Sequence, residues 1–584
     1  MKRLSSFNSL RALVFGLAVA SMAIPAPASA DPWKFGVISD TQWVSETAGY
    51  PDAAQLNPNT VAVSIIKQID KRFIDAGVKL VVAVGDLGDS NNAINMRTRA
   101  AFAQELYNNG IGFFPLRGNH DSSADQANAF LSLFPQTQSG LMNATSANNL
   151  SDPSVIGAFY PAQHNTYKGT FTIGTNFISP DTITQTTPKG TFTGSLAGLS
   201  YAFTYRNTRF VLLDQFAPSN NNDSANPSTS LQQDWICSAL AAKPADGHAF
   251  VFAHKGLIMG NHADGLFGTD PSQNPNAQNA FQKSLQDNGV RYLINGHDHM
   301  YNRGVVVSPD GTSSVQNITT PSDSSKVYIP ERTANDVKYD KPPRETPIAQ
   351  ELRTIGYTVF TVDGPKVTAE VYTAQVPLRN VKATADVFSE NTPTLVFSKT
   401  DEFGYSLNGK SFLIPRQASY TIIKDSYNGT TASILNGTNG STEHLYDGRP
   451  TTKLVTTGWT PKDNGTARMC DHAESNILSL WGVHDHGANS TDTYVLSISY
   501  AQSKILPAQL GQGSLVLATW NGNDWINAVD KNNGGEKEFV LGPYKAGYQL
   551  GTYGIDPGTH TAWAVINYTG DFAVAGVRHL SLSK

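Results

Sequence analysis

Residues that can bind metal ions follow five short apolar runs in the N-terminal part of the chain. Each group stands at the end of a predicted strand and supplies carboxylates, amides or imidazoles. The five groups are Asp40-Thr41-Gln42, Gly85-Asp86-Leu87-Gly88-Asp89, Gly118-Asn119-His120-Asp121, His254, and Gly296-His297-Asp298-His299. Because open α/β sheets place their ligand sites at the carboxyl ends of the strands, we expect these groups to meet at one edge.

These residue types suit a pair of hard or borderline divalent ions. Carboxylates, imidazoles and amide oxygens bind zinc, iron and manganese, and none of the groups contains a thiolate that would select a softer ion. One carboxylate can bridge two ions about 3.5–4 Å apart, as in two-metal hydrolytic sites. In an extended His-x-His the side chains of His297 and His299 point the same way, so the two rings can serve adjacent ions. Glycines before Asp86, Asn119 and His297 let the backbone turn tightly.

Apolar runs alternate with amphipathic stretches from residue 33 to about 300, which indicates a layered α/β domain. The predicted strands are 33–39, 79–85, 111–118, 248–254 and 290–296. The predicted helices are 60–77, 97–110, 228–242 and 276–289. Hairpins are expected at 200–215, turning at Arg206-Asn207, and at 356–374, turning at Asp363-Gly364.

The character of the sequence changes after about residue 385. Short alternating segments separated by Asn, Gly and Asp turns replace the amphipathic stretches, which predicts an all-β, sandwich-like domain over 385–584. The preceding domain is expected to cover 31–380. Within it, residues 122–200 are rich in Asn, Ser and Thr and too long for a plain connection, so we expect an insertion over a functional face.

The five groups, in this order and each after a strand, resemble the calcineurin-like metallophosphoesterase superfamily over roughly residues 33–375. The resemblance implies a four-layer α/β/β/α sandwich, here followed by the all-β domain. It implies a metal-dependent phosphoric ester hydrolase that acts on phosphate mono- or diesters through a hydroxide held between two metal ions. The implied cofactors are two divalent or mixed-valence ions of manganese, iron or zinc, and the implied partner is a small-molecule phosphate ester or nucleotide-type substrate.

The resemblance also implies a role for each residue. The first ion would be bound by Asp40, Asp86 and His299, with Gln42 in the fourth position. The second would be bound by the bridging Asp86 with Asn119, His254 and His297. His120 would hydrogen-bond the phosphate or protonate the leaving oxygen, and Asp89 and Asp121 would orient imidazoles, as metal sites usually require.

Gln42 departs from the family's commonest pattern, which has histidine there. A neutral amide oxygen is a weaker ligand than imidazole, so we expect the first ion to bind less tightly than with histidine. Glutamine occurs in subgroups acting on nucleotide diphosphate derivatives, which leaves cleavage of a pyrophosphate linkage as an alternative. Trp43 could stack on such a substrate or simply pack. A further alternative is a surface or carbohydrate-binding protein in which the β-domain is the functional part.

Other histidines carry weaker signals. His262 and Asp264 could reach the substrate or lie on a loop surface, and His164 supports neither interpretation. A second triplet, His484-Asp485-His486, lies far from the other groups; even with Asp471-His472 nearby, a solvated loop is the favoured interpretation.

The N-terminus has the layout of a secretory signal peptide over residues 1–30. A basic start precedes an apolar run from Ala12 to Ile24 and a small-x-small site at Ala28-Ser29-Ala30, and the run is too short for a membrane anchor. We therefore expect a secreted or periplasmic protein without a membrane span. Cleavage after Ala30 removes three cations and changes the formal net charge from −5 to −8. An acidic chain without a basic cluster is not expected to bind nucleic-acid duplexes.

The chain has two cysteines, Cys237 and Cys470, which fall in different predicted domains. An oxidising compartment would allow them to pair. The preferred interpretation is that each is a small buried apolar residue. Oligomeric state is left open.

Overall fold

A computed structural model of the chain describes residues 31–43, 60–89, 93–142, 170–218, 227–324, 326–328, 344–375, 378–380, 386–388, 394–407, 410–414, 421–422, 430–436, 445–446, 449–450, 453–460, 473–481, 493–500 and 514–576. Several sequence predictions lie outside these residues: the signal peptide over 1–30, His164, Cys470, Asp471-His472 and the second triplet His484-Asp485-His486.

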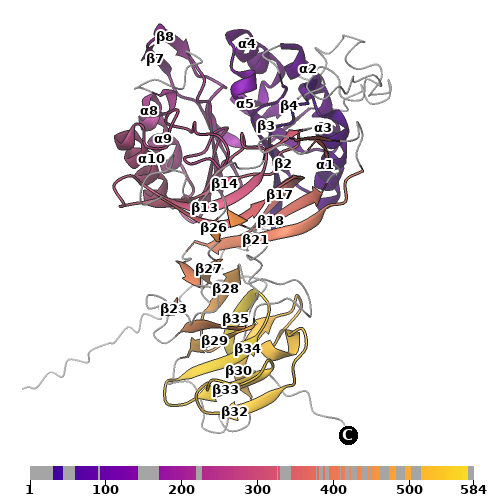
Figure 1. Cartoon of the computed structure of the whole chain (residues 1–584), viewed down its shortest axis with the longest axis vertical. Coiled ribbons are helices and arrows are strands. Elements are labelled where there is room, and N and C mark those ends of the chain that lie inside the picture. The colour runs from indigo at the N-terminus through magenta and orange to yellow at the C-terminus, as the bar shows by residue number, and fades with distance from the viewer. Residues whose placement is uncertain are drawn as a thin grey trace, which may run out of the picture.

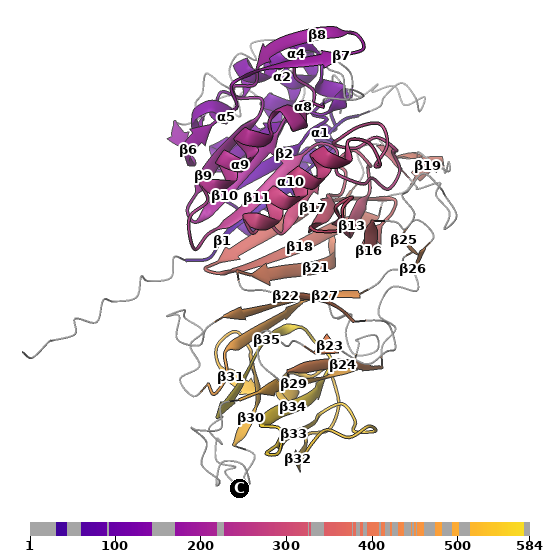
Figure 2. The same cartoon turned by 90° about the vertical axis from the view of Figure 1, so that its left-hand side faces the viewer.

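The N-terminal domain contains two large β-sheets that face each other, with helices on both outer sides (Figures 1 and 2). The first sheet has the order β21 (Ser398–Ser406), β18 (Lys366–Gln375), β17 (Thr354–Asp363), β1 (Trp33–Ile38), β2 (Leu80–Val84), β3 (Gly112–Leu116). The second has the order β16 (Glu345–Glu351), β13 (Tyr301–Val307), β14 (Ser314–Thr319), β12 (Tyr292–Asn295), β11 (His248–Ala253), β10 (Thr208–Leu213), β9 (Tyr201–Tyr205), β6 (Thr175–Ile178). The expected four-layer α/β/β/α sandwich is confirmed.

The helices fall into two groups, one for each sheet. Those beside the first sheet are α1 (Val63–Ala76), α2 (Ala93–Phe102), α3 (Gln104–Asn108), α4 (Ala124–Leu133) and α5 (Gln136–Ser139). Those beside the second are α8 (Ser228–Leu231), α9 (Gln233–Ala241) and α10 (Pro275–Asp287). The predicted strands, both hairpin turns and the helices over 60–77 and 276–289 are confirmed to within a few residues at their ends. The segments predicted as single helices over 97–110 and 228–242 are each divided in two, into α2 and α3 and into α8 and α9.

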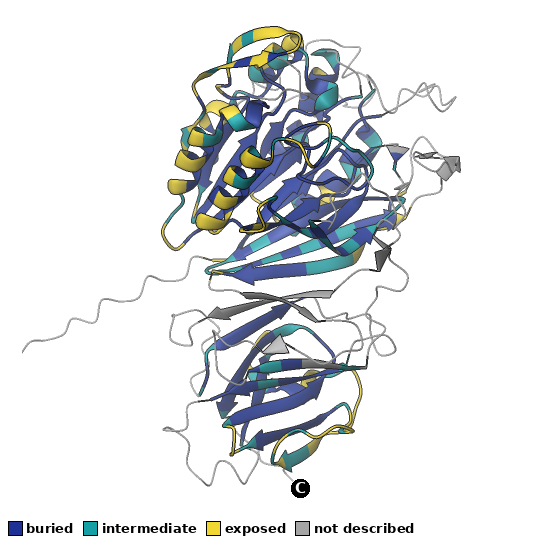
Figure 3. Ribbon diagram, turned by 60° about the vertical axis from the view of Figure 1, so that its left-hand side comes forward, coloured by how far each residue is buried: buried dark blue, intermediate teal, exposed yellow. Residues whose placement is uncertain are grey.

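Helix α1 shows why these segments form where they do. Ile65, Ile69 and Phe73 recur at helical spacing and are buried, and the helix ends at Gly77, whose φ of 69° is a left-handed conformation that favours glycine. A Cβ on Gly36 of β1 would lie 2.4 Å from the Phe73 ring, so glycine lets the helix pack closely on the sheet. Helices α9 and α10 likewise bury one side and expose the other (Figure 3).

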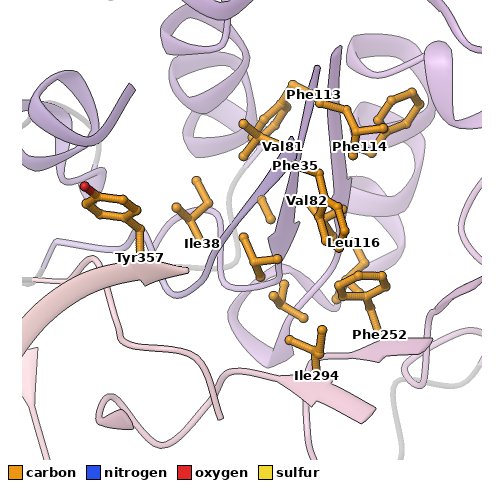
Figure 4. Packing of buried hydrophobic residues seen from close by; sticks show 14 of the residues in the cluster. Phe35, Ile38, Val81, Val82, Phe113, Phe114, Leu116, Phe252, Ile294 and Tyr357 are labelled. Carbon is orange, nitrogen blue, oxygen red and sulfur yellow. The ribbon is translucent and has the colours of Figure 1, made fainter. Parts of the chain in front are cut away.

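Aromatic rings fill the space between the two sheets (Figure 4). Phe35 of β1 stacks on Phe360 of β17 at 4.8 Å between ring centroids, and it meets Phe210 and Phe250 of the other sheet edge-on at 5.1 and 5.0 Å. Offset and edge-on contacts of this kind add to the stabilisation from burial. The central strands β2, β3, β10, β11 and β12 are buried on both faces, which explains their continuous apolar sequences.

Two features of the first domain differ from the predicted boundaries. Strand β21 (Ser398–Ser406) pairs with β18, so the first sheet extends past residue 380 and the β17–β18 hairpin does not end it. Within the predicted insertion 122–200, β6 (Thr175–Ile178) joins the second sheet as its edge strand. The same segment contains the pairs β4 (Leu141–Met142) with β5 (Phe171–Thr172) and β7 (Thr182–Thr187) with β8 (Gly190–Ser195).

The C-terminal domain is built from two six-stranded sheets around one apolar core, as the predicted all-β sandwich-like domain requires. One sheet has the order β22 (Lys410–Ile414), β27 (Lys453–Thr460), β28 (Ile477–Trp481), β35 (Gly570–Gly576), β30 (Leu515–Trp520), β31 (Trp525–Asn527). The other has the order β23 (Thr421–Ile422), β24 (Thr431–Asn436), β29 (Thr493–Ser499), β34 (Thr561–Ile566), β33 (Thr552–Asp556), β32 (Glu538–Leu541). Small additional pairings involve β15 (Lys326–Val327), β20 (Asp386–Phe388) and β19 (Leu378–Asn380), and β25 (Leu445–Tyr446) with β26 (Arg449–Pro450).

A partly buried ion pair joins the two domains. Lys366 Nζ of β18 lies 2.8 and 2.9 Å from the two carboxylate oxygens of Asp571 on β35, and Ser479 Oγ donates to the same carboxylate at 2.6 Å. Beside it, a Cβ on Gly404 would lie 2.8 Å from the Trp481 ring, so β21 packs closely against β28. The two domains are therefore docked through specific contacts.

Two further expectations concern cysteine and the membrane. Cys237 is a free, exposed thiol on α9, so the prediction that it is buried is wrong. The cysteine occupies the outward side of an amphipathic helix, where it contacts solvent rather than the core.

Among the described helices, none combines the length and the apolar character that a membrane crossing requires.

Candidate metal centre

Sharp turns at the strand ends bring the predicted ligands together. Asp40 follows β1, Asp86 follows β2, and His297 and His299 follow β12. These four residues have φ values of 51°, 50°, 75° and 50°, a left-handed conformation that side chains other than glycine rarely adopt. Backbone strain of this kind concentrates at functional sites, where the surrounding structure enforces it.

The first group of candidate ligands consists of Asp40, Asp86 and His299. One ligand atom from each lies within 4.8 Å of the others, and all three side chains are buried. His299 Nε2 is 3.5 Å from Asp40 Oδ1, and the side-chain amide of Gln42 lies 2.9 Å from the same ring nitrogen. The structure thus places Gln42 beside this group, where a half-turn of its amide would present Oε1.

The second group consists of Asp86, His254 and His297, again with ligand atoms within 4.8 Å of one another. His254 Nε2 lies 3.4 Å from Asp86 Oδ1 and 2.9 Å from Asn119 Oδ1. The other ring nitrogen, Nδ1, donates to the carbonyl oxygen of Val84 at 2.8 Å. That bond orients the ring and leaves Nε2 facing Asp86 and Asn119, as metal-binding histidines require.

Three glycines allow this close approach. A Cβ on Gly118 would lie 1.9 Å from Asp86 Oδ1, and one on Gly296 would lie 1.8 Å from Ser39 Oγ. Neither residue has a positive φ, so here glycine provides space rather than the tight turn expected from the sequence. Gly85 does both, because its φ is 91° and a Cβ would lie 2.5 Å from His254 Nδ1.

The electrostatics of the site suit a cation. Burial, assisted by Asp86, raises the pKa of Asp40 to about 6. Burial would lower the pKa of His254, but Asp86 outweighs it and raises that pKa to about 9; His254 and His120 in turn hold the pKa of Asp86 well below its usual range. His254 donates its Nδ1–H to Val84, and its Nε2 faces two oxygen acceptors, Asn119 Oδ1 and Asp86 Oδ1. Only a proton or a cation between them can satisfy His254 Nε2 and both oxygens. The donors present therefore fit a divalent ion.

His120 lies on the open side of Asp86. Its side chain is 30% exposed, and its Nε2 is 4.0 Å from Asp86 Oδ2. Nδ1 donates to the carbonyl oxygen of Asp89, whose carboxylate lies farther away at 3.9 Å. Asp89 therefore orients this imidazole mainly through its backbone.

Asp121 does not orient an imidazole through any described hydrogen bond. Its Oδ2 accepts from the backbone N–H of Leu87 at 2.7 Å and of Gly118 at 3.2 Å, which ties the loop after β2 to the loop after β3. Burial and the neighbouring Asp86 raise its pKa to about 7. The predicted role is corrected to that of a loop anchor, because the carboxylate faces backbone donors.

A loop after β11 supplies residues whose place the sequence left open. His262 and Asp264 both lie against His297: the His262 ring centroid is 4.0 Å away, and Asp264 Oδ1 accepts from His297 Nε2 at 3.3 Å. Lys255 pairs with Asp264. Burial, His262 and Lys255 hold the pKa of His297 well below its usual range.

Sequence reasoning missed the residue that holds this loop. Asp298, the middle residue of the triplet, is fully buried; Oδ1 accepts from His262 Nδ1 at 2.8 Å, and Oδ2 accepts from the backbone N–H of Asn261 at 2.9 Å. The backbone at His297 and His299 is left-handed rather than extended as the sequence led us to expect, so strand alternation does not place Asp298 and no local signal pointed to its partners. Trp43 is buried in the core, which confirms packing rather than substrate stacking.

Two candidate metal-ligand groups that share Asp86 lie where the two stacked sheets meet, an arrangement that suits a dinuclear metal site. A family model described as calcineurin-like phosphoesterase matches residues 34–301. Residues 34–301 are thus similar to that family, and this match together with the two ligand groups supports a metal-dependent phosphoric ester hydrolase. No curated protein matches the chain.

Solved structures with similar folds are distant in sequence. A purple acid phosphatase from yellow lupin is 16% identical, with 59% of this chain and 52% of that chain covered and a TM-score of 0.33. A dimetal phosphatase from Danio rerio is 16% identical, with 58% and 96% covered and a TM-score of 0.29. The GAP50 anchor in the inner membrane complex of Plasmodium is 14% identical, with 60% and 90% covered and a TM-score of 0.32.

Proposed function

We propose that the protein hydrolyses phosphate mono- or diesters at two divalent or mixed-valence metal ions that Asp86 bridges. The observation that carries the proposal is that one buried carboxylate belongs to both ligand groups. The proposed ligands of the first ion are Asp40, Gln42, Asp86 and His299, and those of the second are Asp86, Asn119, His254 and His297. Manganese, iron and zinc all suit carboxylate, imidazole and amide donors.

Two ions so held would lower the pKa of an attacking water and neutralise charge on the phosphoryl oxygens. The protein's own groups add orientation and a proton. With its Nδ1–H held by the Asp89 carbonyl, His120 keeps Nε2 on the side of Asp86, where a substrate phosphate would lie. In this position His120 can hydrogen-bond the phosphate or protonate the leaving oxygen.

Turnover of paired substrates tests the proposal. Protein freed of metal with a chelator should be inactive, and manganese or zinc should restore hydrolysis of p-nitrophenyl phosphate, of bis-p-nitrophenyl phosphate, or of both. The ratio of the two rates separates a monoesterase from a diesterase. No hydrolysis of either compound with manganese or with zinc would contradict the proposal.

The nucleotide alternative has lost part of its support. Of the two residues that favoured it, Trp43 is buried and only Gln42 remains beside the site. A nucleotide diphosphate-sugar is therefore a third substrate in the same assay. Preference for it over both aryl phosphates would replace ester hydrolysis with pyrophosphate cleavage as the proposed reaction.

We also propose that the protein is exported to the periplasm or the medium, on the basis of the basic, apolar and small-residue pattern over residues 1–30. Cell fractionation followed by N-terminal sequencing tests this. An N-terminus at Asp31 in the exported fraction is the expected result, and an uncleaved protein in the cytosol would contradict it.

A further inference from the structure

A fully buried ion pair connects the two sheets next to the second ligand group. Arg117 follows β3 of the first sheet and Asp214 follows β10 of the second. Arg117 Nε donates to Asp214 Oδ2 at 2.6 Å, and the two side chains are 1% and 0% exposed. A charge pair this enclosed persists only where its geometry and its other hydrogen bonds compensate for the loss of water.

On the first sheet, Arg117 holds the turn that carries Asn119 and His120. Its Nη1 donates to the carbonyl oxygens of Asp121 and Ser123, both at 3.2 Å. The Arg117 guanidinium therefore fixes both ends of the turn, because Arg117 directly precedes it and Asp121 and Ser123 follow Asn119 and His120. Fixed, planar donors make arginine suited to such multiple contacts, and lysine cannot reproduce them.

On the second sheet, Asp214 holds the turn that supports His254. Its Oδ1 accepts from the backbone N–H of Phe216 at 2.8 Å and of Ala217 at 3.0 Å. Within that turn, Gln215 Oε1 accepts from the backbone N–H of Lys255 at 2.9 Å, and the Phe216 ring lies 6.1 Å from the His254 ring. The carboxylate is thus connected to the chain at His254.

Asn119 and His254 come from different sheets yet meet at 2.9 Å, from Asn119 Oδ1 to His254 Nε2. The sheets face each other mainly through apolar side chains, and apolar contact is non-directional. A directional contact is needed to set one sheet against the other at the ligands. We propose that the Arg117–Asp214 ion pair is the positioning pair that sets Asn119 against His254 and so completes the second metal site; this rests on the proposed metal ligands.

The fold offers a matched control. Arg303 on β13 of the second sheet pairs with Asp401 on β21 of the first, with Nε to Oδ2 at 2.8 Å and Nη2 to Oδ1 at 3.1 Å. Its side chain is 2% exposed, and it also bridges the two sheets. Its described hydrogen-bond partners include none of the proposed ligands. Loss of this pair should loosen the sheets without moving Asn119.

The experiment compares Arg117→Lys with Arg303→Lys by calorimetric titration with Mn²⁺ in the full chain. Each substitution is made in a His299→Ala background, which leaves only the second site, and in a His254→Ala background, which leaves only the first. The expected result is that Arg117→Lys weakens Mn²⁺ binding at the second site about 10- to 100-fold, the usual effect of losing a group that orients a ligand, and leaves the first site unchanged. Arg303→Lys should change neither affinity, although thermal unfolding shows both variants destabilised.

Equal weakening at both sites, or equal effects of the two substitutions, would overturn the inference. If Arg117→Lys fails to fold, Asp214→Asn replaces it, because its amide oxygen can still accept from Phe216 and Ala217 while the charge is lost. Wild-type protein that binds fewer than two Mn²⁺ would instead overturn the proposed metal site, and the positioning role with it.

Discussion

The two metal-ligand groups share Asp86 but differ in what surrounds them. Behind the first group lies Asp323, a buried acid whose pKa is raised well above its usual range by burial and, among other charges, by Asp40. Around the second group lie Lys255, its ion-pair partner Asp264, and His262. The first group is the more anionic because two of its three members are carboxylates, against one in the second group. Asp323 adds little to this difference, because its raised pKa favours the neutral acid.

The groups also differ in access. The ligand side chains of both groups are buried, at 6% exposed or less, but three neighbours of Asp86 and His297 are partly open: His120, His262 and Asp264 are 30%, 28% and 32% exposed. An enclosed anionic site suits a tightly held ion, and an open one suits contact with a ligand. We infer that the first ion is the more strongly bound and that substrate arrives on the side of the second.

The largest expected effect comes from His120, which stands on the open side. His120→Asn should lower kcat by about 10²–10⁴-fold, the usual contribution of a positioned acid or base, and should leave both ions bound. Steady-state kinetics with metal analysis by mass spectrometry measures both quantities. Asp89→Ala is the control, and its effect should be much smaller because His120 bonds to the Asp89 carbonyl. Loss of an ion from His120→Asn would show that the residue is structural.

The order in which the ions leave tests the difference in charge. Titration of the loaded protein with a chelator should remove the second ion first, with affinities that differ by at least about tenfold, or roughly 1.4 kcal/mol. His254→Ala should retain one ion at the higher affinity, and His299→Ala one ion at the lower. The reverse order would mean that Gln42 weakens the first site more than the nearby acids strengthen it.

Substitution at Gln42 sharpens the same comparison with a smaller expected change. Gln42→His should tighten the first ion, because imidazole is a better donor than an amide oxygen, and Gln42→Ala should weaken it. Calorimetric titration in the His254→Ala background isolates this site. If neither variant changes the affinity, Gln42 only hydrogen-bonds His299 and does not bind the ion.

A separate effect, on stability rather than on metal binding, concerns the acids behind the first group. Burial raises the pKa of Asp70 on α1 to about 8. Because the folded state holds this proton above the pH at which an unfolded chain releases it, stability should fall as pH rises from about 4 to 8. Asp70→Asn should therefore show a smaller loss of unfolding free energy between pH 5 and pH 9 than wild type. Denaturant unfolding at both pH values measures it, and an unchanged pH dependence would contradict the assignment.

The sequence predicted the parts of this site that follow from local pattern. Apolar runs, helical spacing and the polar residues after each strand located β1, β2, β3, β11 and β12 and the ligand candidates at their ends. Strand ends meet at one edge whatever the details of packing, so these predictions needed no long-range contact.

Contacts between distant elements could not be predicted in the same way. Nothing local marks Arg117 as the partner of Asp214, 97 positions away, or Asp298 as the acceptor for a loop before α10. Asp121 was given the wrong partner because spacing does not show whether a carboxylate faces an imidazole or backbone N–H groups. Strand β21 was placed in the wrong unit because its sequence alternates like that of the C-terminal strands, and only pairing with β18 reveals its sheet.

The most direct test of the account is the metal content and turnover of Asp86→Asn beside wild type, with Asp121→Asn as a matched buried carboxylate that belongs to neither ligand group. The account predicts two ions per chain and phosphate ester hydrolysis in wild type and in Asp121→Asn. Asp86→Asn should bind both ions poorly and lose turnover by about 10³-fold or more, in line with the several kcal/mol that metal ions contribute. An Asp86→Asn protein that keeps two ions and normal turnover would contradict the shared, bridging carboxylate on which the account depends.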